Sequence, residues 1–234
     1  MKKIIYTSFL TTLFLLISFT FYLSTFGIET SKFNNIIIKE IKKKDPNIKL
    51  QINKIKVKFD VRKFQIYLKT LEPQIIYQDV KIPIKEINIY SKIISILKSK
   101  NEINQAIILI ENFNIQDLQK LVVRIKPSNL KTYLLNNLNS GEIEKILINV
   151  KLDENSNIYD YQVNGSVKKV NVKVFDGLSI KNVNLNFISD KNLTLINSIS
   201  ANYQGISISN GSTSLMRNKE IRIEGKFNSQ FNLN

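Results

Sequence analysis

The chain has 234 residues, 43% of them hydrophobic, and 34 Lys and Arg against 19 Asp and Glu give it a formal charge of +15. It contains no His and no Cys, which excludes histidine general bases, thiol nucleophiles, disulfides and His/Cys zinc sites. Its length and apolar content are sufficient for one or two domains with a sizeable core.

The positive charge has two interpretations. Abundant Ile, Lys and Asn are typical of an AT-rich coding bias, whereas a functional basic surface would attract anionic lipid headgroups or nucleic acid. The lysines are spread along predicted strands, Arg occurs at four positions, and no nucleic-acid recognition motif is present. We therefore expect no nucleic-acid partner.

The amino terminus, MKKIIYTSFLTTLFLLISFTFYLSTFG, has two lysines followed by an uncharged run from Ile4 to Ile28. As a helix at about 1.5 Å per residue this run reaches about 35 Å, which is enough to cross a bilayer. It exceeds the usual signal-peptide core of about 7 to 15 residues, and Thr25-Phe26-Gly27 is a poor cleavage site. We predict an uncleaved transmembrane anchor over residues 1–28, with a cleaved signal peptide as the alternative.

Lysines on both sides of the span bear on its orientation. Lys2 and Lys3 favour a cytoplasmic amino terminus and an exported body, whereas the lysines between Lys32 and Lys44 oppose it. The absence of Cys agrees with an exported domain without disulfides and equally with a cytosolic one.

Residues 29–46 form a predicted juxtamembrane helix, capped by Thr30 or Ser31 and ended by Asp45-Pro46. Its apolar side includes Phe33, Ile36, Ile37 and Ile41, and lysines occupy the other side. The helix either covers the end of a sheet or lies on the membrane surface.

An α+β region is predicted over residues 47–140. Period-two alternation indicates strands from Asn47 to Ile89, with breaks at Glu72-Pro73 and near Gln78-Asp79. A short helix capped by Ser91 follows over residues 91–101, then a strand over 106–115. A helical pair over 116–138 is divided by Pro127.

Residues 141–234 are predicted to form an antiparallel β-meander of amphipathic strands. The apolar phase is odd up to Val167 and even from Val170, so a bulge or bend is expected at Lys168-Lys169. A similar slip separates Ile180 from Val183. The repeated apolar face needs a partner: it closes as a sandwich or barrel, packs on the helices, or forms an open trough that holds acyl chains.

The acidic residues form no recognisable reaction centre. Glu142 and Glu144 share strand parity, and Asp153-Glu154 lies at a predicted turn, but no metal-binding loop pattern is present. We expect no catalytic residue, no metal site, no cofactor and no enzyme activity.

Several segments resemble the AsmA-like family of envelope proteins, the group that includes AsmA, TamB and YhdP, over their amino-terminal portion. FNNIIIKEIKKKDPNIKLQINKIKVKF is similar to the segment after the anchor in that family. The phrases YQVNGSVKKVNVKVFDGLSIKNVNLNF, ANYQGISISNGS and IRIEGKFNS are similar to its repeated strand-and-turn units.

The resemblance implies a single-pass protein of the bacterial inner membrane, with its bulk in the periplasm. It further implies a hydrophobic β-groove that carries phospholipids toward the outer membrane or maintains that membrane, with phospholipid acyl chains, the inner membrane and other envelope proteins as partners. The groove candidates are Val163, Val167, Val170, Val172, Leu178, Ile180, Val183, Leu185 and Phe187.

The chain departs from that family in length. Roughly ten strands at about 4.8 Å each span on the order of 50 Å, which is too short to bridge an envelope, so we expect a continuation or a partner. Two rival interpretations remain. One is a structural or assembly scaffold with a closed β core. The other is a bitopic jelly roll that resembles the lipopolysaccharide-bridge anchor subunit, against which the helical pair argues.

Overall fold

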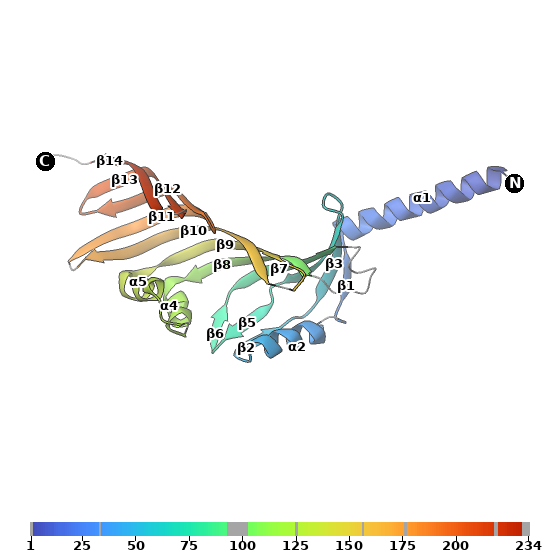
Figure 1. The fold of residues 1–234 in the computed structure, drawn as a ribbon, viewed down its shortest axis with the longest axis horizontal. Helices are drawn as coiled ribbons and strands as arrows, with labels where there is room; N and C mark the ends of the chain where they lie inside the picture. The colour runs from blue at the N-terminus through green and yellow to red at the C-terminus, as the bar shows by residue number, and fades with distance from the viewer. Residues whose placement is uncertain are drawn as a thin grey trace.

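The fold is mainly β, with a long amino-terminal helix and one extended antiparallel sheet (Figure 1). The computed structural model describes residues 2–32, 34–92, 103–124, 126–155, 157–175, 177–217 and 220–230. The described helices are α1 (Lys2–Thr25), α2 (Asn34–Lys44), α4 (Ile115–Arg124) and α5 (Asn129–Asn137). The predicted fold class is confirmed.

The large sheet has eleven strands, and it does not close into a barrel. Its strands, in sheet order, are β1 (Ile28–Thr30), β3 (Ile55–Asp60), β4 (Gln65–Leu71), β7 (Ile84–Lys92), β8 (Ile103–Asn114), β9 (Leu138–Leu152), β10 (Ile158–Phe175), β11 (Leu178–Asp190), β12 (Leu193–Tyr203), β13 (Ile206–Arg217) and β14 (Ile221–Gln230). This is a meander without the crossed connections of a jelly roll.

The helix α1 is long and apolar enough to span a membrane, and it is uncovered by the rest of the chain. It ends at Thr25, and Gly27, with a φ of 72° and a backbone N–H bond to Tyr22 O, forms a left-handed cap after it. The Nζ of Lys58 donates to Thr25 O at 2.8 Å. The sheet therefore begins at the end of α1 without a linker.

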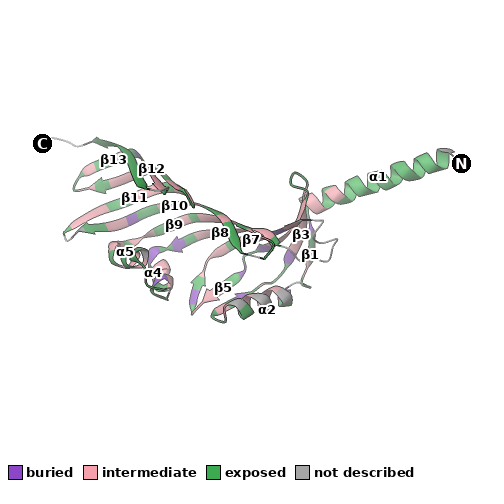
Figure 2. Cartoon of the chain, in the orientation of Figure 1, coloured by how far each residue is buried: buried purple, intermediate pink, exposed green. Residues whose placement is uncertain are grey.

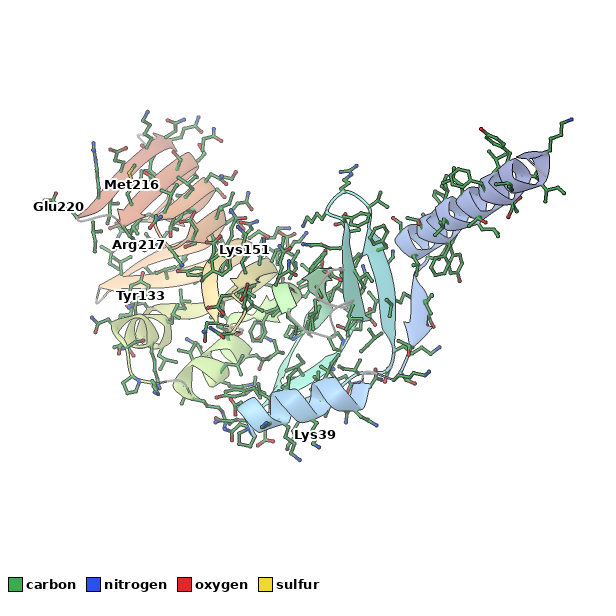
Figure 3. The ribbon with its side chains drawn as sticks, turned by 45° about the vertical axis from the view of Figure 1, so that its right-hand side comes forward. Lys39, Tyr133, Lys151, Met216, Arg217 and Glu220 are labelled. Carbon is green, nitrogen blue, oxygen red and sulfur yellow. The ribbon has the colours of Figure 1, made fainter. Side chains whose placement is uncertain are left out.

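The helix α2 packs against β2 (Ile48–Gln51). It begins at Asn34, later than the predicted caps, because Thr30 belongs to β1 and its hydroxyl accepts from Lys32 N. The amide of Asn34 donates to Ile52 O at 2.8 Å and Asn53 O at 3.0 Å. Lys39 lies on the outer side of α2 (Figure 3). The helix therefore packs on a sheet, which is the first of the two arrangements that the sequence suggested.

A small sheet lies beside the large one, in the order β2, β5 (Gln74–Tyr77), β6 (Val80–Ile82). Along the chain β2 precedes β3, and β5 follows β4 after the predicted break at Glu72-Pro73. Pro83 separates β6 from β7. Proline cannot donate to a ladder, which is why the strands break there. Figure 1 shows this sheet, α2, α4 and α5 on one side of the large sheet.

The predicted short helix over residues 91–101 falls mainly outside the described residues. Ser91 itself lies in β7 and pairs with Ile66 of β4 and Ile103 of β8. The strand β7 therefore continues through the first residue of the predicted helix.

The predicted helical pair is confirmed as α4 and α5, with Pro127 between them. Asn114 caps α4 by accepting from Asp117 N at 2.7 Å, and Ser128 caps α5 by accepting from Lys131 N at 3.1 Å. The side chain of Gln119 donates to Leu138 O at 2.6 Å. These contacts fix the pair against the start of β9.

The predicted division at residue 140 falls inside β9, which pairs with β8 on one side and β10 on the other. One continuous sheet thus carries both regions. Buried residues are concentrated where helices or the small sheet cover it, and exposure increases toward β14 (Figure 2).

Candidate functional site

One row of neighbouring residues crosses all eleven strands of the large sheet on a single face. Direct cross-strand partners point to the same side, so the register defines the row. In sheet order its members are Thr30, Ile55, Thr70, Ile87, Ile108, Ile148, Val163, Ser189, Thr194, Leu215 and Ile223. None of them is charged. We call the side of the sheet that carries this row the apolar face.

The row one residue away lies on the opposite side, which we call the polar face. Its members are Glu29, Lys56, Lys69, Asn88, Ile107, Asn149, Gln162 and Asp190. A shift of one residue in a strand moves a side chain to the other face. The alternation in the sequence therefore yields a sheet with one apolar face and one polar, partly charged face.

All of the predicted groove residues lie on the apolar face. Val167 pairs with Leu185, Val170 with Val183, and Val172 with Ile180. The remaining members, Val163, Leu178 and Phe187, lie on the same face further along the two strands. The register thus brings the whole predicted set together across β10 and β11.

Bulges keep the apolar residues on one side. The register shifts between Val167 and Val170, at the predicted Lys168-Lys169 position, and Lys169 has a φ of 51°. The second predicted slip is also confirmed, because Asn182 has a φ of 54° and the pairing shifts opposite it. A bulge inserts one unpaired residue and so reverses the alternation.

Asparagine side chains hold this distorted backbone. Lys169 N donates to the side-chain oxygen of Asn184, and Asn182 N donates to that of Asn171, each at 3.0 Å. These bonds replace ladder hydrogen bonds that the bulges remove.

The bulges in β12 and β13 were not predicted from the sequence. Ser198 in β12 and Asn210 in β13 have φ values of 53° and 51°, and the register shifts beside each. A change of apolar phase between Ile196 and Ile199 would have indicated the first. Together the bulges carry the apolar face through β14.

Aromatic rings cover glycines on this face. A Cβ atom at Gly165 would lie 2.6 Å from the ring of Phe187, and one at Gly211 would lie 2.7 Å from the ring of Phe227. The ring of Phe227 also lies over Gly225. Cross-strand aromatic residues of this kind shield the backbone that a glycine leaves open.

Helices cover one part of the apolar face. Phe113, Ile143 and Val170 are only 4–5% exposed and pack with Ile115 of α4. We call this cluster the covered region. The partly buried residues that pack against it include Val167, Val172 and Val183. Several of the predicted groove residues therefore contact protein.

The far end of the apolar face is uncovered. Ile221, Ile223 and Phe227 of β14 are 74%, 65% and 56% exposed. We call these three residues the open region. Val163, Leu185 and Phe187 lie between the two regions and are half-buried. Large apolar side chains that are exposed together mark a surface that binds something apolar.

The polar face is lined by ion pairs. Lys69 and Glu86 lie 2.6 Å apart, Lys151 and Asp160 lie 2.8 Å apart, and Lys168 bonds Glu144. The bond from Lys168 holds the pKa of the Glu144 carboxyl below its ordinary value. These groups suit a face that is turned to water.

Among the described residues, no three His, Cys, Asp or Glu side chains come together to hold a metal ion.

These features define a class of protein: a mainly β chain with an amino-terminal helix that can span a membrane, and one open, two-faced sheet. No protein-family model matches the chain, and neither a curated protein nor a solved structure is significantly similar to it. The resemblance to the AsmA-like family therefore stays a hypothesis.

Proposed function

We propose that the chain is an AsmA-like, single-pass protein of the bacterial inner membrane whose bulk lies in the periplasm. In this proposal its apolar face receives phospholipid acyl chains and contributes to their transport toward the outer membrane, or to maintenance of that membrane. Each buried CH₂ group is worth roughly 0.8 kcal/mol. A continuous apolar surface would therefore lower the cost of moving an acyl chain through water.

The single observation that carries the proposal is the uncharged row. It starts in β1, which follows α1 directly, and it reaches Ile223 in β14 without meeting a charge. At the anchor end the row itself is buried at Ile55 and Thr70, whereas Ile28 on the same face is 43% exposed, so a lipid that leaves the membrane there would first meet Ile28. The charged row on the opposite face supports the same orientation, with the polar face turned to water.

Neighbouring residues in β11 provide a direct test. Leu185 lies on the apolar face and Asn186 on the polar face. A photo-crosslinking amino acid at each position, activated in intact bacteria and followed by lipid analysis, should capture phospholipid at 185 and little or none at 186. Equal capture at both positions, or none at 185, would sink the lipid proposal.

One observation favours a scaffold as a second candidate function. Every residue of β14 is exposed, and β14 pairs only with β13 within the described residues. An exposed edge of this kind can accept a strand from another protein. Crosslinks from position 185 to protein, without lipid, would favour the scaffold.

A further inference from the structure

A second element lies beside the anchor, at the turn between β3 and β4. This hairpin tip comprises Val61, Arg62, Lys63 and Phe64. Val61 and Phe64 are 55% and 69% exposed, and both cations between them are exposed. Exposed apolar groups flanking cations are the composition that binds an anionic membrane surface.

The tip is held in place at the carboxyl end of α1. A Cβ atom at Gly27 would lie 2.7 Å from Lys58 Cγ, and Lys58 Nζ bonds Thr25 O. Val61 is three residues beyond Lys58, roughly 10 Å along the strand at about 3.3 Å per residue. Figure 1 shows the loop after β3 beside the end of α1.

Aromatic residues mark the level of the membrane surface on α1. Tyr22 and Phe26 pack together with ring centroids 5.6 Å apart and are 50% and 63% exposed. Aromatic side chains are enriched at the membrane–water interface. The hairpin tip leaves the sheet beside the same last turns of the helix.

The tip has a defined conformation. Asp60 Oδ1 accepts from Arg62 N at 3.0 Å and from Lys63 N at 3.1 Å. Phe64 has a φ of 51° and meets Phe59 edge to face at 5.5 Å. A left-handed backbone at a bulky residue is unfavourable, so these contacts hold Phe64 where it is exposed.

We propose that the hairpin tip is a second membrane contact, in which Val61 and Phe64 enter the interface and Arg62 and Lys63 bind anionic headgroups of the bilayer that holds α1. The contact fixes how the sheet stands on the membrane. This inference rests on the anchoring part of the proposed function. It does not depend on lipid transport by the apolar face.

The natural absence of cysteine allows single-site labelling of the full chain. Three variants, Val61→Cys, Ile17→Cys and Asn186→Cys, carry an environment-sensitive fluorophore in vesicles of phosphatidylcholine with an equal share of phosphatidylglycerol. Nitroxide lipids then report contact by quenching. We expect strong quenching at 17 by deep nitroxides and at 61 by shallow ones, with little at 186, which is exposed on the polar face.

The three positions separate the possible failures. Quenching at 17 without quenching at 61 would overturn the tip contact and leave the anchor standing. Absence of quenching at 17 would overturn the anchor, and the tip proposal with it.

The charge requirement is tested in the Val61→Cys background. Each cation near an anionic surface contributes about fivefold, equivalent to about 1 kcal/mol, so Arg62→Gln with Lys63→Gln should reduce contact of the tip with the anionic vesicles. Lys42→Gln with Lys43→Gln on α2 is the matched control and should change little. Equal quenching at 61 in vesicles of phosphatidylcholine alone would overturn the headgroup part of the proposal.

Discussion

The covered and open regions of the apolar face arise from the same alternation but have different surroundings. Val170 is 5% exposed beneath α4 and α5, whereas Ile223 is 65% exposed at the last strand. Alternation determines which side of the sheet is apolar. Coverage depends on the helical pair, which the chain inserts between β8 and β9.

The two regions should therefore differ most in what they contribute to stability. Truncating Phe113→Ala in the covered region should lower the free energy of unfolding by about 3–5 kcal/mol, because a cavity forms beneath α4. The exposed control Ile223→Ala should change it by no more than about 0.5 kcal/mol. Denaturant unfolding of the detergent-solubilised chain measures both, and similar losses would mean that the regions are not distinct.

Substitutions at the glycine–aromatic pairs should show a smaller difference in the free energy of unfolding, again with the larger loss farther from β14. A methyl group at Gly165 would meet both the ring of Phe187 and, at 3.0 Å, the carbonyl oxygen of Lys145. We expect Gly165→Ala to cost about 1–3 kcal/mol by overpacking. Gly225→Ala should cost less, because the atom nearest to the added methyl group belongs to the ring of Phe227, which lies on the edge strand and can move, and the hydroxyl of Thr213 lies 3.4 Å away. Equal costs in thermal unfolding would show that β14 is held as firmly as β11.

The bulge at Lys169 joins the two regions on one face. A left-handed backbone costs a side-chain-bearing residue about 1–2 kcal/mol, so Lys169→Gly should raise the free energy of unfolding by about 1 kcal/mol. Lys168→Gly, one residue earlier in the strand, should lower it by about 0.5–1 kcal/mol. The same sign for both variants in a denaturant titration would argue against the bulge.

The smallest effect is expected on the polar face. The bond from Lys168, helped by one from Ser166, lowers the pKa of Glu144 below 4.5. Such a carboxylate stabilises the fold above its ordinary pKa, and this contribution is lost as the pH falls through the lower, folded value. The denaturant concentration at the unfolding midpoint should decrease slightly when the pH is lowered below 4.5. Glu144→Gln should remove this part of the pH dependence. Glu142→Gln is the exposed control.

The sequence was sufficient to predict an amino-terminal helix long enough to span a membrane, from its uncharged run, and the meander, from local alternation. Alternation also placed the nine candidate residues of β10 and β11 on one face. It also located the bulge at Lys169, since the apolar phase changes there. The extension to Ile223 was missed because Gly211 and Gly225 interrupt the apolar pattern in β13 and β14. Coverage by α4 could not be predicted, because an amphipathic helix does not specify the strands on which it packs.

The most direct test of the account compares crosslinks from the two regions in one preparation of membranes. A photo-crosslinking residue at Val172, which packs against the covered region, should yield adducts within the protein. The same residue at Ile223 should yield phospholipid adducts. The ratio of lipid to protein adducts should be higher at 223 than at 172. An equal or reversed ratio would contradict it.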